Sequence, residues 1–489
     1  MGRRHWGMVI VGLILVVLSG RQLGTAMQGL EAIIIRDADP PLHFVQPRNT
    51  LPLSRPLVLV GHGFSGSTVI MRGFALTLAH GGYTVAVWDF DGHGSNPRPM
   101  ASGALLENAE AVLEQATMLG FGDPERMAIL GHSMGSGVAL QFGQAHPDTA
   151  ATIAVSPVAQ PVTPELPRNL LLMAGALEPA FLRNAEERMA EGGAPTGDPI
   201  GDPAAGTARK LAVIPGVEHL SILFSPAAHA EALDWLDATF GPQPGAREYA
   251  DRRVVWYGAG LLGFLLVGAG LAPLVAGPRP ADAPRRPLWR RLAALIGGAL
   301  GATLLLWLSS LAGLDLRGLL GVQVGGYLLV WFGLAGLLSL LGLWVRPGLP
   351  SWRAVLGGLL AFAVLWLGVG MLGQWVWLPW LLIPRRLVLW LPGALLLLPW
   401  FLAAGEMVAG ARPFGRAGWW LAHSIVLAGS MFLAMQLNSE LGFIILTLPL
   451  FPIILALHAL AAGPLRGRWP FALSGALFVS WLLLAVFPM

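Results

Sequence analysis

Cysteine is absent from this sequence of 489 residues. Disulfide bonds, thiolate metal sites and a cysteine nucleophile are therefore excluded. Charged side chains are also scarce, at 12%, whereas hydrophobic residues make up 55% of the chain. This balance lies outside the range of soluble globular proteins. Lysine is nearly absent as well, because Lys210 is the only one and the other basic residues are arginines.

The hydrophobic residues are distributed unevenly along the chain. Residues 28–250 have the composition of a soluble domain, whereas residues 254–489 are long apolar runs separated by short loops that carry arginine. We therefore expect an N-terminal signal sequence at 1–27, a soluble domain at 28–245 and a membrane domain at 246–489. Hydropathy predicts about eight helices of bilayer length in the last part. They are expected near residues 254–276, 292–312, 320–344, 354–374, 387–410, 419–437, 443–462 and 470–487.

The N-terminal segment joins a basic head to an apolar run. Arg3 and Arg4 precede residues 7–20, which carry no charge. This pattern is typical either of a signal peptide, with Gly24-Thr25-Ala26 as the cleavage site, or of a retained signal anchor. The apolar run is short for a complete crossing of the bilayer. In both cases the soluble domain is expected on the extracytoplasmic side.

The arginines of the membrane domain alternate between loops. The loops expected inside carry Arg279, Arg285, Arg286, Arg290, Arg291, Arg346, Arg353, Arg412, Arg416, Arg466 and Arg468, and the outer loops carry only Arg317, Arg385 and Arg386. This distribution follows the positive-inside rule, with Arg385-Arg386 as the one discordant pair. We therefore expect a multi-pass protein of the cell membrane whose main partner is the lipid bilayer. The sequence pI of about 9.8 reflects this topology and does not indicate nucleic-acid binding.

Short apolar strands alternate with helical stretches within residues 28–250. This alternation predicts an α/β fold, with a mostly parallel sheet covered by helices on both faces. Strands are expected at 57–60, 84–88, 127–130, 152–155, 169–174 and 211–214, and helices at 69–80, 103–119, 136–142, 181–191 and 227–240. In such sheets the functional groups gather at the carboxyl ends of the strands.

One pentapeptide stands between a predicted strand and a predicted helix. It reads Gly131-His132-Ser133-Met134-Gly135 and has the G-x-S-x-G pattern of a nucleophile elbow. The turn is so tight that the residues two positions away from the serine must be almost free of side chain, which Gly131 and Gly135 provide. The helix that follows directs its N-terminal dipole at developing negative charge.

A serine hydroxyl needs a base, an acid that orients the base, and donors for the oxyanion. His219 is the candidate base because it follows the strand 211–214, and Glu178 is the candidate acid because it follows the strand 169–174. The order Ser133, Glu178, His219 is the order of the nucleophile-elbow enzymes. Asp91 and Glu218 are the alternative acids.

The candidate oxyanion hole combines two backbone N–H groups. One belongs to Met134, and the other to Phe64, with Ser65 as the second choice. Gly63 allows the main chain to approach a substrate carbonyl closely. His62, Gly63 and His132 are expected to line the pocket, and His62 also to orient the loops around it.

The matching segments together resemble the α/β-hydrolase superfamily over residues 57–240. They are His62-Gly63-Phe64, Asp91-Gly92-His93-Gly94-Ser95, Asp123-Pro124, the elbow itself, Gly175-x-x-Glu178 and Glu218-His219-Leu220. The resemblance implies a serine hydrolase that uses Ser133, Glu178 and His219, although glutamate at the acid position is less common than aspartate. The family often inserts a cap domain before the acid. Here residues 156–168 are too few for a helical cap, so the site is expected to be open or covered by the membrane domain or the bilayer.

The sequence therefore predicts a membrane-bound serine hydrolase that cleaves carboxylic esters, including lipid or lipid-linked ones, through an acyl-enzyme. It predicts no cofactor and no metal. An acyltransferase with the same triad is one alternative, and a transporter or channel with a hydrolase-fold sensing domain is another. Within the membrane domain, Glu406 and His423 are the ionisable pair to examine, since such groups mark functional sites by default.

Overall fold

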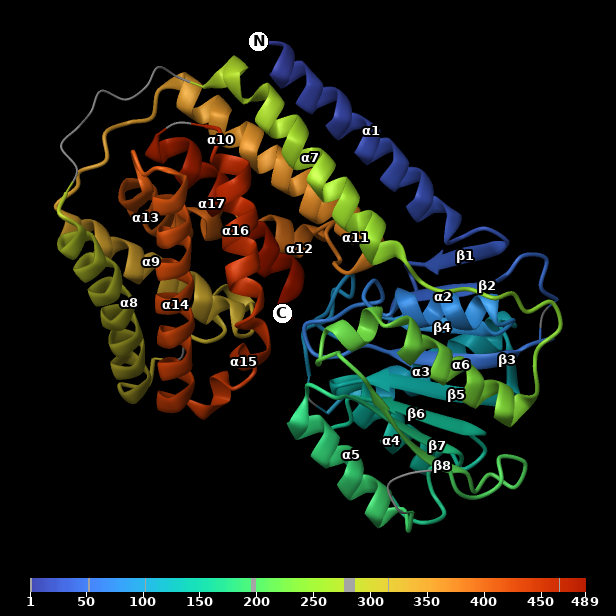
Figure 1. Ribbon diagram of the computed structural model, residues 1–489. Coiled ribbons are helices and arrows are strands. Elements are labelled where there is room, and N and C mark those ends of the chain that lie inside the picture. Colours follow the sequence, from blue (N-terminus) through green and yellow to red (C-terminus); the bar gives the residue numbers. More distant parts are fainter. Residues whose placement is uncertain are drawn as a thin grey trace.

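The structure is a computed structural model that describes residues 2–51, 53–101, 103–194, 199–276, 286–314, 316–465 and 467–489. Figure 1 shows two parts, an α/β domain (residues 30–240) and a helical region (residues 253–489), with the N-terminal helix packed along the latter. The predicted fold class, an α/β domain followed by a helical region, is confirmed.

An eight-stranded sheet forms the centre of the α/β domain, in the order β1-β2-β4-β3-β5-β6-β7-β8. The strands are β1 (Leu30–Ile35), β2 (Leu42–Pro47), β3 (Pro56–Gly61), β4 (Thr84–Trp88), β5 (Asp123–His132), β6 (Ala151–Val155), β7 (Leu170–Gly175) and β8 (Arg209–Ile214). From β4 to β8 all neighbours in this order are parallel, whereas β1 and β2 pair antiparallel at one edge. The sequence predicted the six parallel strands and missed these two. Only Leu30 of β1 is buried, although its residues 32–35 are all apolar, and the apolar residues of β2 are interrupted by His43 and Gln46.

Helices cover both faces of the sheet because successive strand residues point to opposite sides. Val58 and Val60 pack with α2 (Arg72–His80) and α6 (Pro226–Phe240). Leu57 and Leu59 pack on the other side with α3 (Leu105–Leu119) and α4 (Met134–Ala145), and α5 (Pro179–Glu191) covers the far strands of that side. The carboxyl ends of β3, β5, β6, β7 and β8 thus meet at one edge.

The described residues contain eight helices that are long and apolar enough to cross a membrane. They are α1 (Arg3–Thr25), α7 (Arg253–Val275), α8 (Leu288–Leu311), α9 (Gly325–Leu343), the continuous span from α10 to α11 (Trp352–Val376), the span of α12 and α13 (Pro384–Val408), α14 (Pro413–Leu437) and α17 (Arg468–Val486). The single helix expected at 443–462 is wrong. That stretch is a pair, Ser439–Thr447 and Leu450–Ala462 (α16), bent by 50°. Pro449 lies at the break, where its ring and missing N–H do not permit a continuous helix.

The N-terminal helix α1 is longer than the apolar run that defines it in the sequence, with 23 residues. Its Gly12 lies directly against Gly263 of α7, since a Cβ on Gly12 would come within 2.6 Å of the Gly263 carbonyl oxygen. The Ser19 hydroxyl also donates to the Trp256 carbonyl at 2.6 Å. Close backbone approach through small residues, with a hydroxyl bond across the pair, is the way membrane helices associate.

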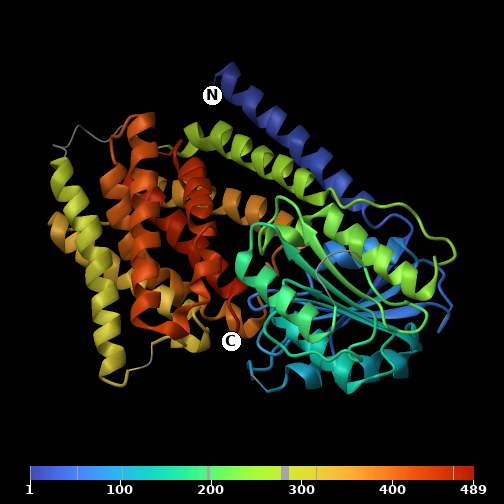
Figure 2. The same ribbon diagram turned by 60° about the horizontal axis from the view of Figure 1, so that its bottom comes forward.

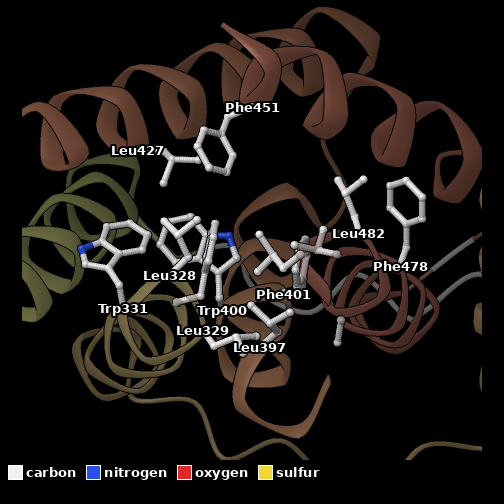
Figure 3. Close-up of a cluster of buried hydrophobic side chains, with 14 of the residues drawn as sticks. Leu328, Leu329, Trp331, Leu397, Trp400, Phe401, Leu427, Phe451, Phe478 and Leu482 are labelled. Carbon is white, nitrogen blue, oxygen red and sulfur yellow. The ribbon is translucent and has the colours of Figure 1, made fainter. Parts of the chain in front are cut away.

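Aromatic and leucine side chains from five helices fill the centre of the helical region. Figure 3 shows them converging from α9, α13, α14, α16 and α17. Trp331 and Trp400 are almost completely buried, with ring centroids 5.4 Å apart. This packing holds the helices as one unit, so their ends form a defined surface toward the α/β domain.

Arg386 joins the two parts of the molecule. Its buried guanidinium donates to the carbonyl oxygens of Leu484 and Phe487 at 2.6 and 2.7 Å and, across the boundary, to that of Gly92 at 2.6 Å. The last residue of the sequence, Met489, completes the contact, because its N–H donates to the Gly92 oxygen and its own oxygen accepts from the Met100 N–H. The C mark lies at this boundary in both ribbon views (Figures 1 and 2). Arg385 and Arg386, the two arginines that depart from the positive-inside rule, therefore both donate hydrogen bonds to the α/β domain, Arg386 to Gly92 and Arg385 to Pro97.

A second polar contact lies beside the first helix of the α/β domain. Arg72 donates to the Gln374 carbonyl oxygen at 3.0 Å. Arg253, which is ion-paired with Asp251 at 2.6 Å, donates to the neighbouring Trp375 carbonyl at 2.7 Å. Two arginines thus satisfy carbonyl groups that the end of α11 (Leu372–Val376) leaves free.

Replacement of Arg386 by methionine should destabilise the docking of the two parts. The change removes the donor to the carbonyl oxygens of Leu484 and Phe487, at a cost of about 1–3 kcal/mol for each, and leaves the Gly92 oxygen with the Met489 N–H alone. We expect Arg386→Met to lower the unfolding temperature of the detergent-solubilised protein and to make the 92–100 loop sensitive to limited proteolysis. Arg385→Met is the matched control, because Arg385 is exposed and, among the described residues, makes one hydrogen bond, to the Pro97 oxygen. Equal effects of the two substitutions would contradict the assignment of Arg386 as the joint.

Candidate active site

Ser133 lies on a sharp turn between β5 and α4. Its backbone has φ 53° and ψ −117°, a conformation that side-chain-bearing residues rarely adopt. A Cβ on Gly131 would stand 1.9 Å from the Gly135 carbonyl oxygen, and a Cβ on Gly135 would stand 2.6 Å from that of Gly61. The glycines of the pentapeptide are therefore required by the close approach of two strands and a helix, and the turn directs the serine away from the sheet.

The structure brings Ser133, His219 and Glu178 together from three loops. His219 Nε2 lies 3.1 Å from Ser133 Oγ, and His219 Nδ1 lies 3.0 Å from Glu178 Oε2. In the tautomer that carries the proton on Nδ1, the ring donates to the carboxylate and can accept from the hydroxyl. The Phe181 ring stacks on the imidazole with centroids 4.1 Å apart and so limits its rotation.

Glu178 is fixed by its other carboxylate oxygen. Oε1 accepts from the Ser156 hydroxyl at 2.8 Å and from the Gly175 N–H at 2.5 Å. The two alternative acids have different partners. Asp91 accepts from the Asn96 amide, and the exposed Glu218 accepts from the backbone N–H groups that follow His219 in the chain. Glu178 is thus the acid whose position matches the predicted constellation.

His62, Gly63 and His132 were expected in the pocket wall, but the structure places them behind it. His132 Nε2 bonds to the His219 carbonyl oxygen at 3.0 Å, and burial lowers the pKa of His132 well below its usual value, so the ring is neutral at pH 7. His62 accepts from the Phe90 N–H through Nε2 and bonds the Gly63 oxygen through Nδ1. The two imidazoles are used to hold backbone segments, as was expected for His62, and this role keeps them out of the cavity.

The candidate oxyanion donors lie on either side of the serine. Met134 begins α4, so its N–H is among those that a helix leaves unpaired at its start. Phe64 belongs to the loop after β3, and Gly63 of that loop packs directly on Ser133, since a Cβ there would be 3.0 Å from the Ser133 Cβ. Both Phe64 and Met134 line the same cavity as Ser133.

Asp89 was not singled out in the sequence, although it directly follows a strand that was predicted correctly. Its buried carboxylate accepts from the Thr68 N–H through Oδ1 and from both the N–H and the hydroxyl of Ser95 through Oδ2, each at 2.7 Å. Burial opposes the ionisation of this group. The electrostatic interactions with the neighbouring His62 and His43 imidazoles and the donated hydrogen bonds outweigh burial and lower the pKa of Asp89. Asp89 therefore ties the loop after β3 to the loop after β4.

A cavity of about 480 Å³ opens at Ser133. Its volume is in the range of ligand pockets. The side chains of its lining are mainly apolar, and among the described residues none of them is charged. They are Phe64, Gly103, Leu105, Leu106, Ser133, Met134, Gly137, Val138, Gln141, Val158, Gln160, Phe181, Phe443 and Leu446. Phe443 and Leu446 come from the helical region, which was one of the covers that the sequence left open, although neither residue was singled out there.

Glu406 and His423, the two ionisable residues singled out in the helical region, have separate partners and no described bond to each other. Glu406 is bound by Arg468 at 3.1 Å and by Arg286 at 3.6 Å. His423 instead bonds through Nδ1 to the Trp419 oxygen, one turn earlier in its own helix. Among the described residues there is also no group of three metal-binding side chains. Arg279, Arg285 and Arg466 of the expected inner loops lie outside the described residues.

Comparison with known proteins finds similarity to one family model in the first part of the chain. Residues 53–199 match the family model described as serine aminopeptidase, S33. This range includes Ser133 and Glu178 and ends before His219. An uncharacterised protein of Mycobacterium tuberculosis is 31% identical over 119 residues, which are 23% of this chain and 34% of the relative. Another from the same organism is 31% identical over 100 residues, 20% of this chain and 36% of the relative. The chain thus spans about a third of the length of these relatives.

Solved structures of hydrolases are also similar to part of the chain. A soluble variant of monoglyceride lipase from Saccharomyces cerevisiae is 15% identical and covers 43% of this chain and 95% of its own, with a TM-score of 0.31. A bacterial heroin esterase is 17% identical and covers 47% of this chain and 90% of its own, with a TM-score of 0.32. The strand order, the elbow and the family match support an α/β-hydrolase fold for the first part of the chain, and a region of long apolar helices follows it.

Proposed function

We propose that this protein is a membrane-bound serine hydrolase that cleaves carboxylic esters through an acyl-enzyme. The observation that carries the proposal is the unbroken line of contacts from Glu178 through His219 to Ser133, which ends at the mouth of an apolar cavity. A serine in this arrangement has its base in place, the base has its orienting acid, and the reacting hydroxyl faces space for a substrate.

The proposed reaction has two halves. In the first, Ser133 Oγ attacks the ester carbonyl carbon while His219 Nε2 takes the hydroxyl proton, and the N–H groups of Phe64 and Met134 stabilise the oxyanion. The intermediate collapses, the alkoxide leaves with the proton from His219, and the acyl group remains on Ser133. In the second half, His219 removes a proton from water, the hydroxide attacks the acyl carbon, and Ser133 regains its proton as the acid leaves. Glu178 stabilises the imidazolium in both halves.

The cavity lining favours an ester with an apolar acyl group over a peptide with a free amino end. An aminopeptidase must bind an ammonium group, and a buried cation requires a paired anion. The described lining has no carboxylate, and its two amide side chains bond to each other, Gln141 to Gln160 at 3.0 Å. These features support an uncharged acyl chain as the group that the cavity accepts.

The arginine distribution supports an extracytoplasmic position for the α/β domain. The ends of the helical region that touch this domain include Gln374, Arg386, Phe443 and Met489. The opposite ends carry most arginines of the described loops. They are Arg286, Arg290, Arg291, Arg346, Arg353, Arg412, Arg416 and Arg468. Because positive loops remain in the cytoplasm, the α/β domain is assigned to the other side.

A fluorophosphonate probe should label the purified, detergent-solubilised protein at Ser133. Labelling requires an activated serine, so Ser133→Ala and His219→Ala should abolish it, whereas Ser54→Ala, at an exposed turn, should leave it unchanged. In-gel fluorescence with peptide mapping checks this result. Labelling that survives in Ser133→Ala, or a wild type that is folded and never labelled, would contradict the proposal.

The identity of the acid can be tested with a matched pair of substitutions. Glu178→Gln keeps the shape of the side chain but loses the charge that stabilises the imidazolium, so we expect kcat for a soluble ester to fall by about 10²- to 10⁴-fold. Glu218→Gln removes a charge that directly precedes His219 in the chain, yet its carboxylate bonds only to backbone groups of its own turn among the described contacts, and kcat should change less than about threefold. The reverse ranking would show that Glu218 is the acid.

A further inference from the structure

We propose that the helical region completes the acyl-binding site, with Phe443 and Leu446 as its specificity-determining residues and a membrane-resident acyl ester as the substrate. The inference rests on the proposed ester hydrolysis and adds to it the part of the chain that selects the substrate. It starts from the fact that two residues of the helical region line the cavity at Ser133.

The contact between Phe64 and Phe443 connects the two sides of the cavity. Their rings meet edge to face with centroids 4.4 Å apart and planes inclined by 68°. Phe64 also lies edge-on to His93, at 5.7 Å, within the α/β domain. The residue whose N–H is the proposed oxyanion donor thus carries a ring that packs on the helical region. The helical region therefore helps to set the position of the loop beside the serine.

The segment that carries Phe443 and Leu446 is short and held at its ends. It runs over η4 (Ser439–Leu441) and α15 (Ile444–Thr447), between α14 and α16. Asn438 caps its start by accepting from the Glu440 N–H at 3.1 Å, and Glu440 is ion-paired with Arg317. At the far side Ile444 is fully buried and Pro449 ends the segment. A segment fixed in this way can serve as a wall of defined shape.

The α/β domain itself leaves this side of the cavity uncovered. Between β6 and β7 the chain has only residues 156–169, of which Val158 and Gln160 reach the cavity lining. The helical region occupies the side that this short connection does not reach. The cover of the site is therefore provided by a distant segment of the same chain. Phe443 follows His219, the last of the three triad residues, by more than 200 positions.

The location of the wall points to a substrate that resides in the bilayer. The 439–447 segment follows the end of α14, a candidate membrane helix, and forms with α16 a bent pair that is long and apolar enough to cross a membrane only as a whole. The segment is therefore assigned to the outer end of a span, at the level where α14 leaves the apolar layer. Ester carbonyls of lipids lie at this same boundary between head groups and acyl chains. Ile445, on the same segment, is 46% exposed and faces away from the cavity, as expected for a segment that also touches lipid. An acyl chain can thus enter the cavity while its head group stays in water.

A series of p-nitrophenyl esters from acetate to laurate tests the proposal on the full chain in detergent. Wild-type kcat/KM should rise with chain length. Leu446→Trp fills the cavity, so we expect kcat/KM for laurate to fall tenfold or more while that for acetate changes less than threefold. Leu446→Ala should shift the preference toward longer chains. Ile445→Trp is the matched control and should retain the wild-type profile.

The outcomes separate this proposal from the proposed function. A wild type that neither hydrolyses the series nor reacts with a fluorophosphonate at Ser133 overturns both. Hydrolysis with the same chain-length profile in Leu446→Trp, Leu446→Ala and wild type overturns the role of the helical region and leaves the esterase intact. Labelling with a small-alkyl fluorophosphonate reports whether each variant is folded. The two Leu446 substitutions change the cavity volume in opposite directions, so one labelled variant is sufficient to test the role of the helical region.

Discussion

The carboxyl edge of the sheet depends on a steric constraint, the close approach of three backbone segments around the elbow. Register pairs Gly61 of β3 with Gly131 of β5, and Gly135 of α4 lies against both segments. A methyl group at Gly131 or Gly135 would overlap a carbonyl group of the neighbouring segment. The serine between the two glycines accepts an unfavourable φ, a cost of about 1–3 kcal/mol that the surrounding packing must offset. In return its hydroxyl stands clear of the sheet, where His219 can reach it.

The same edge that presents the serine also receives the helical region. The loop after β3 carries Phe64, which packs on Phe443, and the loop after β4 carries Gly92, which accepts from Arg386 and Met489. Asp89 ties these two loops together from beneath. Docking and the proposed chemistry are therefore supported by one set of loops, and a change at the boundary is expected to reach the cavity.

Features that are local in sequence could be predicted from it. The elbow is a pentapeptide with its own steric logic, and Glu178 and His219 follow predicted strands in the order that the superfamily resemblance implies. Six strands and most long helices could be placed by apolar runs, since a buried strand or a membrane helix is uniformly apolar. The edge strand β2 lacks such a run, and β1 has a short one at residues 32–35 but lies mostly at the surface. The break at Pro449 was missed because hydropathy averages over a window and does not register a bend.

Features that depend on contacts between distant segments could not be predicted. Arg385 and Arg386 depart from the positive-inside rule, which is visible in the sequence. Nothing in the sequence indicates that Arg386 bonds to Gly92, 294 positions away. Phe443 and Leu446 look like any other apolar residues of a membrane domain. His62 and His132 were assigned to the pocket because they flank the elbow and its neighbouring loop, yet their ring nitrogens bind backbone groups. The position of these two histidines in the sequence predicted that they lie near the site, but it did not predict the direction in which their side chains point.

The central claim is that Ser133 carries the acyl group during turnover, and rapid quenching of the reaction tests it most directly. The full chain would be mixed with p-nitrophenyl octanoate, quenched in acid within milliseconds and analysed by peptide mass spectrometry, with the release of p-nitrophenol followed in parallel. The account predicts a burst of p-nitrophenol that approaches one equivalent and an octanoyl group on the peptide that contains Ser133. Turnover with an acyl group on another residue, or the octanoyl group absent from Ser133 during a full burst, would contradict it.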